Sequence, residues 1–206
     1  MTTLLQIKSS LFSDAGQSSR LADEFVAAWR AANPDGRVIV RDLARDPLPH
    51  LTAARFGAFL AQPAERTPEQ QAVVADSDAL IAELRAADVV VIGLPMYNFG
   101  LPSVLKAYFD HIARAGVTFR YTEQGAVGLL TGKSVYVFAA RGGLYAGTPI
   151  DTQTQYVRHF LGFLGMTDVE FVYAEGLAID PATKARALEA ARATIAALAP
   201  PLRAAA

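Results

Sequence analysis

The chain of 206 residues contains no cysteine. Without a thiol it can form no disulfide bond, thiolate nucleophile, iron–sulfur cluster or cysteine-ligated zinc site. Its three histidines, His50, His111 and His159, show no partner pattern, so we expect them to be surface or structural residues and expect no metal site. Any redox chemistry therefore has to come from a bound cofactor.

An excess of charge of either sign is also missing, because 19 lysine and arginine residues nearly balance 20 aspartate and glutamate residues. Proteins that bind nucleic acid rely on a strong positive field to attract the phosphate backbone. We therefore expect no nucleic-acid partner.

Long hydrophobic runs are absent as well. The longest strongly apolar segment, residues 89–94, is far shorter than the roughly 20 residues that a membrane-spanning helix needs. The first residues have neither the basic segment nor the small-residue cleavage site of a signal peptide. We expect a cytoplasmic protein without membrane contact. Hydrophobic residues still make up 52% of the chain, which is enough for one well-packed core.

What the sequence does contain is a regular alternation of short apolar strands and amphipathic helices. The expected strands cover residues 4–7, 37–41, 89–93, 134–139 and 169–173, and the expected helices cover residues 18–32, 52–60, 68–86, 102–115, 152–164 and 181–198. This order predicts an α/β protein with a doubly wound, five-stranded parallel sheet and helices on both faces. No linker or repeat divides the chain, so we expect a single domain over residues 1–206.

Two local patterns add detail to this outline. Thr67, Pro68 and Gln70 have the spacing of a capping box with proline at the first helical position, so they predict the start of a helix. Residues 117–121 and 128–130 flank a turn and predict a hairpin-like excursion before the next strand of the sheet.

Ligands of such sheets bind at the carboxyl ends of the strands, where the strand order reverses. The first loop at this edge, residues 9–19, carries several serines, a glycine and Gln17 directly before a helix. A helix N-terminus with neutral donors can hold a phosphate group without lysine. An ordinary serine N-cap is the alternative interpretation.

Two nucleotide motifs are not present. The fingerprint G-x-G-x-x-G does not follow the first strand, which argues against a dinucleotide bound there in the usual way. Residues 128–134 resemble a P-loop, but only three residues separate the glycines, and the segment leads into a strand instead of a helix. A mononucleotide fits the first loop better.

Two further loops supply features that suit a flat ligand. Met96, Tyr97, Asn98 and Phe99 combine a thioether, two rings and an amide after the third strand, although buried turn packing would use the same residues. Residues 140–143 place two glycines where backbone can approach a ligand closely, and a tight turn is the alternative there. Three such loops at one edge favour a flavin site over each local alternative.

At this point the sequence resembles a known family. The motifs that carry the resemblance lie at residues 8–10, 17–18, 95–99, 113–122, 141–143 and 174–176, and they span nearly the whole chain. Together they are similar to the FMN-dependent NADH-azoreductases, of which residues 113–122 are the most specific match. The resemblance implies a flavodoxin-like homodimer.

The resemblance also implies a set of FMN contacts. These fall at Ser10, Gly16, Gln17, Ser18, Met96, Tyr97, Asn98, Phe99, Ala140, Arg141, Gly142 and Gly143. Two positions depart from the family pattern, since family members commonly carry a hydroxyl residue where this chain has Gly16 and a small hydroxyl residue where it has Ala140. Backbone N–H groups can serve in both places.

Phe119 and Tyr121 alternate as strand residues do, and cross-strand packing would explain both. The resemblance suggests instead that they bind substrate by covering the flavin pocket of a neighbouring subunit.

The resulting functional expectation is an enzyme that uses FMN and NADH to reduce quinones and azo compounds by ping-pong two-electron transfer. Hydride transfer to a flavin needs orientation and no acid or base side chain, so no catalytic residue is assigned. A flavodoxin-type electron carrier is the main alternative, although a formal net charge of −1 gives little field for steering a protein partner. A hydrolase is disfavoured because the chain has no nucleophile elbow.

Overall fold

The computed structural model describes residues 2–198, so both ends of the predicted domain, residue 1 and residues 199–206, lie outside the described part. Its centre is a parallel sheet in the order β2-β1-β3-β6-β7. The strands are β1 (Thr3–Lys8), β2 (Arg37–Asp42), β3 (Val89–Pro95), β6 (Ser134–Ala140) and β7 (Asp168–Ala174). The predicted five-stranded, doubly wound sheet is confirmed.

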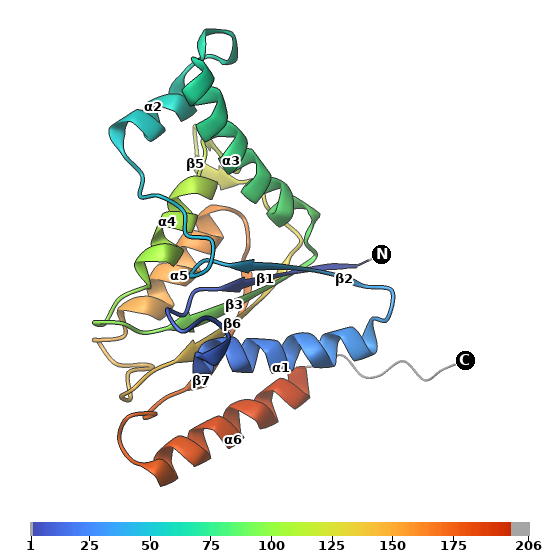
Figure 1. Ribbon diagram of the computed structural model, residues 1–206, viewed down its shortest axis with the longest axis vertical. Helices are drawn as coiled ribbons and strands as arrows, with labels where there is room; N and C mark the ends of the chain where they lie inside the picture. The colour runs from blue at the N-terminus through green and yellow to red at the C-terminus, as the bar shows by residue number, and fades with distance from the viewer. Residues whose placement is uncertain (1, 199–206) are drawn as a thin grey trace.

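Within residues 2–198, six α-helices accompany the sheet (Figure 1). They are α1 (Gln17–Ala32), α2 (Ala53–Leu60), α3 (Pro68–Ala86), α4 (Ser103–Ile112), α5 (Thr152–Phe163) and α6 (Pro181–Leu198). Helices α1 and α6 cover one face and α3, α4 and α5 the other, while α2 and the first half of α3 project beyond the sheet (Figure 1). None of the helices within residues 2–198 has both the length and the apolar character that a bilayer crossing requires.

The continuous apolar character of the strands reflects burial on both faces. Leu4 and Val91 pack with α1 and α6, whereas Leu5, Val90 and Ile92 pack with the helices of the opposite face. Neighbouring strand residues point to opposite faces, so a strand covered on both sides needs apolar residues at every position.

Several predicted boundaries move when the tertiary contacts form. Strand β6 includes Ala140, which was expected in the following loop, because the Met96 N–H donates to the Ala140 carbonyl oxygen at 3.1 Å and extends the pairing with β3. Helix α4 ends at Ile112 instead of residue 115, since Thr118 Oγ1 donates to the Ile112 carbonyl oxygen at 2.6 Å and accepts from the Arg114 N–H at 2.9 Å. The predicted capping box at Thr67 is confirmed.

The excursion after α4 is a two-stranded antiparallel hairpin made of β4 (Phe119–Thr122) and β5 (Gly125–Gly128). Its second strand lies earlier in the chain than expected, because the N–H groups of Leu129 and Leu130 bond to Thr118 and Leu164 outside the hairpin. Gly128 packs so closely on Gly165 that a Cβ there would lie 2.0 Å from the Gly165 nitrogen. The hairpin is thereby fixed against the end of α5.

Candidate cofactor site

The three loops singled out by sequence meet at the carboxyl edge of adjacent strands β1, β3 and β6. Ser9 Oγ donates to the Gly93 carbonyl oxygen at 2.6 Å. The Tyr97 hydroxyl lies 3.3 Å from Ser10 Oγ and accepts from the Leu11 N–H at 3.2 Å. The first and second loops are therefore joined directly, and the edge includes the point where the strand order reverses.

The start of α1 has donors that nothing in the described residues uses. Gly16 is the N-cap residue and supplies no side-chain cap, so the N–H groups of the first helical turn, beginning at Gln17, remain open. Ser18 and Ser19 are fully buried, and their hydroxyl groups have no hydrogen-bond partner within residues 2–198. The alternative of an ordinary serine N-cap is therefore wrong, since the cap position belongs to glycine.

Close packing explains the glycine at position 16. A Cβ on Gly16 would lie 2.1 Å from Ser10 Oγ, and one on Gly93 would lie 3.2 Å from the Ser18 carbonyl oxygen. The start of α1 thus rests directly against the first loop and strand β3. The departure from the family pattern at Gly16 fits this packing.

Lys8 lies next to the first loop, but its charge is already neutralised. Its Nζ is 2.7 Å from Asp14 and 2.8 Å from Asp23. Burial acts to lower the pKa of the Lys8 ammonium, but hydrogen bonds to the two carboxylates outweigh burial and raise it. The hydrogen bond from Lys8 in turn lowers the pKa of Asp14. The donors left for an anion at this edge are therefore mostly neutral.

The second loop is a tight turn in which Tyr97 and Gly100 exchange backbone hydrogen bonds of 2.9 and 3.3 Å. Its two central residues, Asn98 and Phe99, have φ angles of 50° and 62°. Two consecutive positive φ values are typical of a type I′ turn and are unfavourable for a residue such as phenylalanine. Both side chains are exposed, and the Phe99 ring meets Tyr145 edge-on at 5.8 Å.

Within residues 2–198, the third loop has free backbone N–H groups, whereas the charged side chain of Arg141 is buried. Arg141 is 1% exposed, and its guanidinium bonds to Asp151 at 3.0 Å and to Glu175 at 3.1 Å. The carbonyl oxygens of residues 141–143 accept hydrogen bonds from the segment 176–178. The N–H groups of Gly142 and Gly143 take no part in the hydrogen bonds of the described residues. The open donors of this loop are therefore those of Gly142 and Gly143, because the Arg141 N–H already donates to the Ala174 carbonyl oxygen at 2.9 Å.

The partners of Arg141 organise the loop around it. Burial acts to raise the pKa of Asp151, but hydrogen bonds from Arg141 and Thr154 outweigh it and lower the pKa. Glu175 accepts from the N–H groups of Tyr145 and Ala146 at 3.0 and 2.9 Å. One buried cation thereby holds two carboxylates that shape the residues after β6.

Phe119 and Tyr121 do not join this site within their own chain. They lie on the hairpin beside the end of α5, and the Phe119 ring is 4.3 Å from that of Phe163. Phe119 is 7% exposed and belongs to the core, in agreement with the alternative that it is a packing residue. Tyr121, in contrast, is 75% exposed. Only Tyr121 remains free to contact a substrate, and it would have to do so in another subunit.

Sequence reasoning missed four residues that shape the site: Ser19, Asp151, Gln153 and Glu175. Ser19 lies in the first loop and Glu175 in the motif at residues 174–176, so the sequence analysis included both positions but assigned neither residue a role. Asp151 shows the signal of a helix N-cap and accepts from the N–H groups of Gln153 and Thr154. Nothing in the sequence marks Gln153, a buried glutamine on an otherwise ordinary helix.

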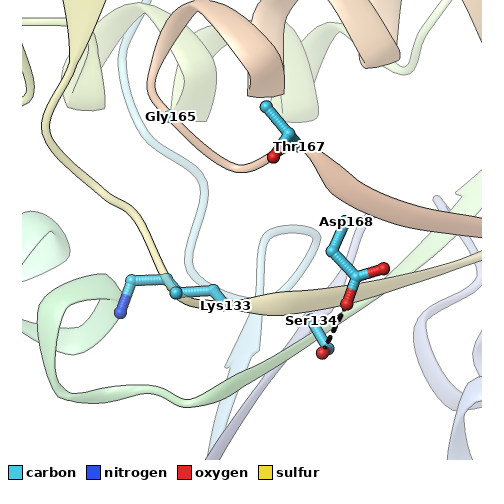
Figure 2. Close-up of a pocket in the computed structure, with 6 residues that line it drawn as sticks. Lys133, Ser134, Gly165, Thr167 and Asp168 are labelled. Carbon is cyan, nitrogen blue, oxygen red and sulfur yellow. Dashed lines mark hydrogen bonds between the residues drawn. The ribbon is translucent and has the colours of Figure 1, made fainter.

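A hollow of about 190 Å³ lies at the opposite end of the sheet, between the start of β6 and the start of β7 (Figure 2). Ser134 and Asp168 close one side of it through a hydrogen bond of 2.7 Å. The Lys133 ammonium instead binds the Ala87 carbonyl oxygen at 2.6 Å, and burial lowers its pKa. Within the described residues, no cluster of acidic and histidine side chains could hold a metal ion.

The residues at the carboxyl edge fit the parts of FMN. The open N–H groups of α1 and the orphaned hydroxyls of Ser18 and Ser19 suit a phosphate group. A buried hydroxyl without a partner is costly, and a ligand oxygen would satisfy it. The rings at Tyr97 and Phe99 and the free backbone at Gly142 suit a flat heterocycle.

Comparison with known proteins gives a consistent result. Residues 2–199 match the model of a family described by a flavodoxin-like fold. An FMN-dependent NADH:quinone oxidoreductase of Cellvibrio japonicus is 62% identical over 177 residues, which cover 86% of this chain and 89% of that protein.

Two solved structures are similar as well. An azoreductase of Bacillus anthracis strain Sterne superposes with a TM-score of 0.89 at 31% identity, covering 97% of this chain and 99% of the other. An FMN-dependent NADH-azoreductase of Bacillus anthracis strain Ames Ancestor in complex with FMN gives 0.86 at 29% identity, covering 97% of this chain and all of the other.

Proposed function

Because the chain belongs to the flavodoxin-like family that includes FMN-dependent NADH:quinone oxidoreductases and azoreductases, we propose that its carboxyl-edge loops bind FMN without a covalent bond. The protein is an oxidoreductase that takes electrons from NADH and reduces quinones and azo compounds. When bound, FMN supplies the redox chemistry, because it accepts a hydride from a nicotinamide and delivers two electrons to the acceptor.

One observation carries the assignment of the site: the start of α1 combines open N–H groups with two buried, unpartnered serine hydroxyls. We assign the phosphate of FMN to these donors of Gln17, Ser18 and Ser19, with Ser10 alongside. The helix dipole adds a partial positive charge at the same place, so no lysine is required. Gly16 lets the helix start approach the first loop closely.

The second and third loops then orient the ring system. The residues 96–99 supply the thioether, the two rings and the amide, and Ala140, Gly142 and Gly143 supply backbone. Arg141 contributes by fixing its loop through Asp151 and Glu175. These groups bind and orient and exclude water, and none of them has to give or take a proton during hydride transfer.

We further propose that nicotinamide and acceptor use the same slot in turn, so that the kinetics are ping-pong. The exposed ring of Phe99 and the half-buried ring of Tyr145 border this slot and suit planar molecules of either kind. A homodimer in the cytoplasm completes the proposal, with Tyr121 of one subunit beside the cofactor of the other.

Reconstitution with FMN followed by steady-state kinetics tests the function. We expect FMN to co-elute with the protein and lose fluorescence at micromolar concentrations. Double-reciprocal plots against NADH at several quinone concentrations should be parallel. Intersecting lines would instead require a ternary complex. NADH oxidation that proceeds only with a protein acceptor would support the electron-carrier alternative.

A further inference from the structure

Gln153 lies in the first turn of α5 and is fully buried. Its side-chain Nε2 donates two hydrogen bonds, one to the Pro95 carbonyl oxygen at 2.9 Å and one to the Gly100 carbonyl oxygen at 2.8 Å. These two acceptors stand at either end of the turn formed by residues 96–99. One amide group therefore spans the base of the second loop, and it does so from a residue more than 50 positions away in the chain.

The turn that Gln153 spans is a strained one. Asn98 and Phe99 both have positive φ angles, and a conformation of this kind persists only where the surroundings over-determine it. Two carbonyl acceptors need two N–H donors, which a side-chain amide supplies and a carboxylate cannot. The neighbouring Thr152 adds a third tie, since its Oγ1 donates to the Phe99 carbonyl oxygen.

The start of α5 is itself fixed to the third loop. Asp151 caps the helix by accepting from the Gln153 and Thr154 N–H groups at 3.2 and 3.1 Å, and its carboxylate also binds the Arg141 guanidinium. The helix start consequently holds the second loop through Gln153 and the third loop through Asp151. Both loops belong to the proposed FMN site, so the start of α5 ties them together in addition to the hydrogen bond from the Met96 N–H to the Ala140 carbonyl oxygen.

A further detail argues against a purely stabilising role. Gln153 Oε1 is buried and has no hydrogen-bond partner among residues 2–198. An unsatisfied buried oxygen costs free energy, which offsets part of what the two donated bonds contribute to stability. The amide is therefore better explained by the position it imposes on the loop than by its net contribution to folding.

We infer that Gln153, supported by Thr152, is a positioning residue for the reaction: it holds the strained turn 96–99 in the conformation that receives the flavin ring. The inference rests on the proposed function and extends it from the residues at the cofactor to the helix behind them. Gln153 need not touch FMN, because it acts through the carbonyl groups at both ends of the turn.

The test compares Gln153→Met with Gln155→Met. Both variants make the same chemical change on the same helix, but Gln155 is exposed and makes none of these bonds. Four quantities are measured: the Kd for FMN by fluorescence quenching, the visible circular dichroism of the FMN-saturated protein, the Tm of the FMN-free protein, and kcat and KM at saturating FMN.

For Gln153→Met we expect FMN binding about tenfold weaker, a changed visible dichroism and a lower kcat, with Tm within a few degrees of the wild type. Gln155→Met should match the wild type in all four. A Gln153→Met protein whose Tm falls while its Kd and dichroism stay unchanged would show a merely structural residue and overturn the inference.

Thr152→Val provides a second variant that is safe for folding, because Thr152 is exposed. It removes only the tie to the Phe99 carbonyl oxygen, so we expect FMN binding roughly threefold weaker and a smaller change in dichroism of the same sign. If Gln153→Met fails to fold, an unchanged Kd in Thr152→Val overturns the inference. Failure of the wild type to bind FMN would refute the proposed function itself.

Discussion

Ser18 and Ser19 place buried hydroxyl groups where the protein alone has no use for them. In most folded proteins a buried hydroxyl is hydrogen-bonded, because leaving it without a partner costs about 1–3 kcal/mol. Here two adjacent ones stand unpartnered within the described residues, beside open N–H groups. At the scale of the single residue, each hydroxyl group therefore lowers the stability of the FMN-free protein while it favours the proposed binding of FMN.

This conflict gives a prediction for Ser18→Ala. Removal of an unsatisfied hydroxyl should leave the free energy of unfolding of the FMN-free protein unchanged or slightly higher. The same change should weaken FMN binding by about 1 kcal/mol, because a hydrogen bond to the phosphate is lost. Urea unfolding without FMN and fluorescence titration with FMN measure the two effects separately.

Ser77→Ala is the matched control. Ser77 is equally buried, but its Oγ donates to the His111 carbonyl oxygen at 2.6 Å, far from the proposed site in sequence. That variant should lose stability and keep its affinity for FMN. The assignment of the phosphate to α1 fails if Ser18→Ala and Ser77→Ala both lose stability and bind FMN equally well.

Helix α5 shows how one element can serve two loops. Its N-cap Asp151 uses the same carboxylate to close the helix and to pair with the buried Arg141. The pKa of Asp151 is lower in the folded protein than in the unfolded chain, so the charged carboxylate contributes stability above its unfolded pKa of about 3.9. That contribution is lost as the pH falls through the folded pKa.

We therefore predict a pH-dependent effect of Asp151→Asn. Asparagine keeps an oxygen to accept from the helix N–H groups but removes the charge that faces Arg141. The free energy of unfolding should fall by about 1–3 kcal/mol at pH 7, and the difference from the wild type should shrink below about pH 4. Urea unfolding between pH 3 and pH 8 measures it.

Asp180→Asn, at the start of α6, serves as the comparison. Asp180 caps its helix by accepting from the Thr183 N–H at 2.8 Å, but its carboxylate is exposed and faces no buried cation. Its substitution should change stability less than that of Asp151. A difference for Asp151→Asn that is the same at every pH would mean that the carboxylate charge is not what matters.

At the scale of the whole molecule, the hairpin β4–β5 lies outside the proposed cofactor site of its own chain. It lies beside the end of α5, while the loops proposed to bind FMN lie at the carboxyl edge of the sheet. Tyr121 is its most exposed ring. Large apolar side chains on other parts of the surface, such as Leu11, Phe12 and Leu60, are also more than half exposed.

We predict that the protein is a dimer of about twice 22.0 kDa by light scattering. If Tyr121 acts across the subunit boundary, Tyr121→Ala should raise the KM for the acceptor without lowering the stability of the dimer. Co-expression of Tyr121→Ala with Ser18→Ala subunits should restore activity at limiting FMN, since each mixed dimer contains one intact site. A fully active monomer would refute the prediction.

The order of strands and helices, the single parallel sheet and the edge to which the cofactor site is assigned in the proposal were predictable from sequence. They depend on local patterns: β-branched runs for strands, helical spacing of apolar residues, and the capping box at Thr67, which the structure confirms. The positions of the three loops follow from the same outline, because the carboxyl ends of parallel strands share one edge. Their amino acids already favoured a flavin.

Only the tertiary structure determined which contacts the side chains of those loops make. Arg141 was predicted at the cofactor, yet its buried guanidinium forms ion pairs with both Asp151 and Glu175. The strain at Phe99 and the tie from Gln153 were equally invisible in the sequence. The physical reason is the same in each case: burial, pairing and backbone strain depend on groups that are distant in the chain, whereas helix and strand signals depend on neighbours.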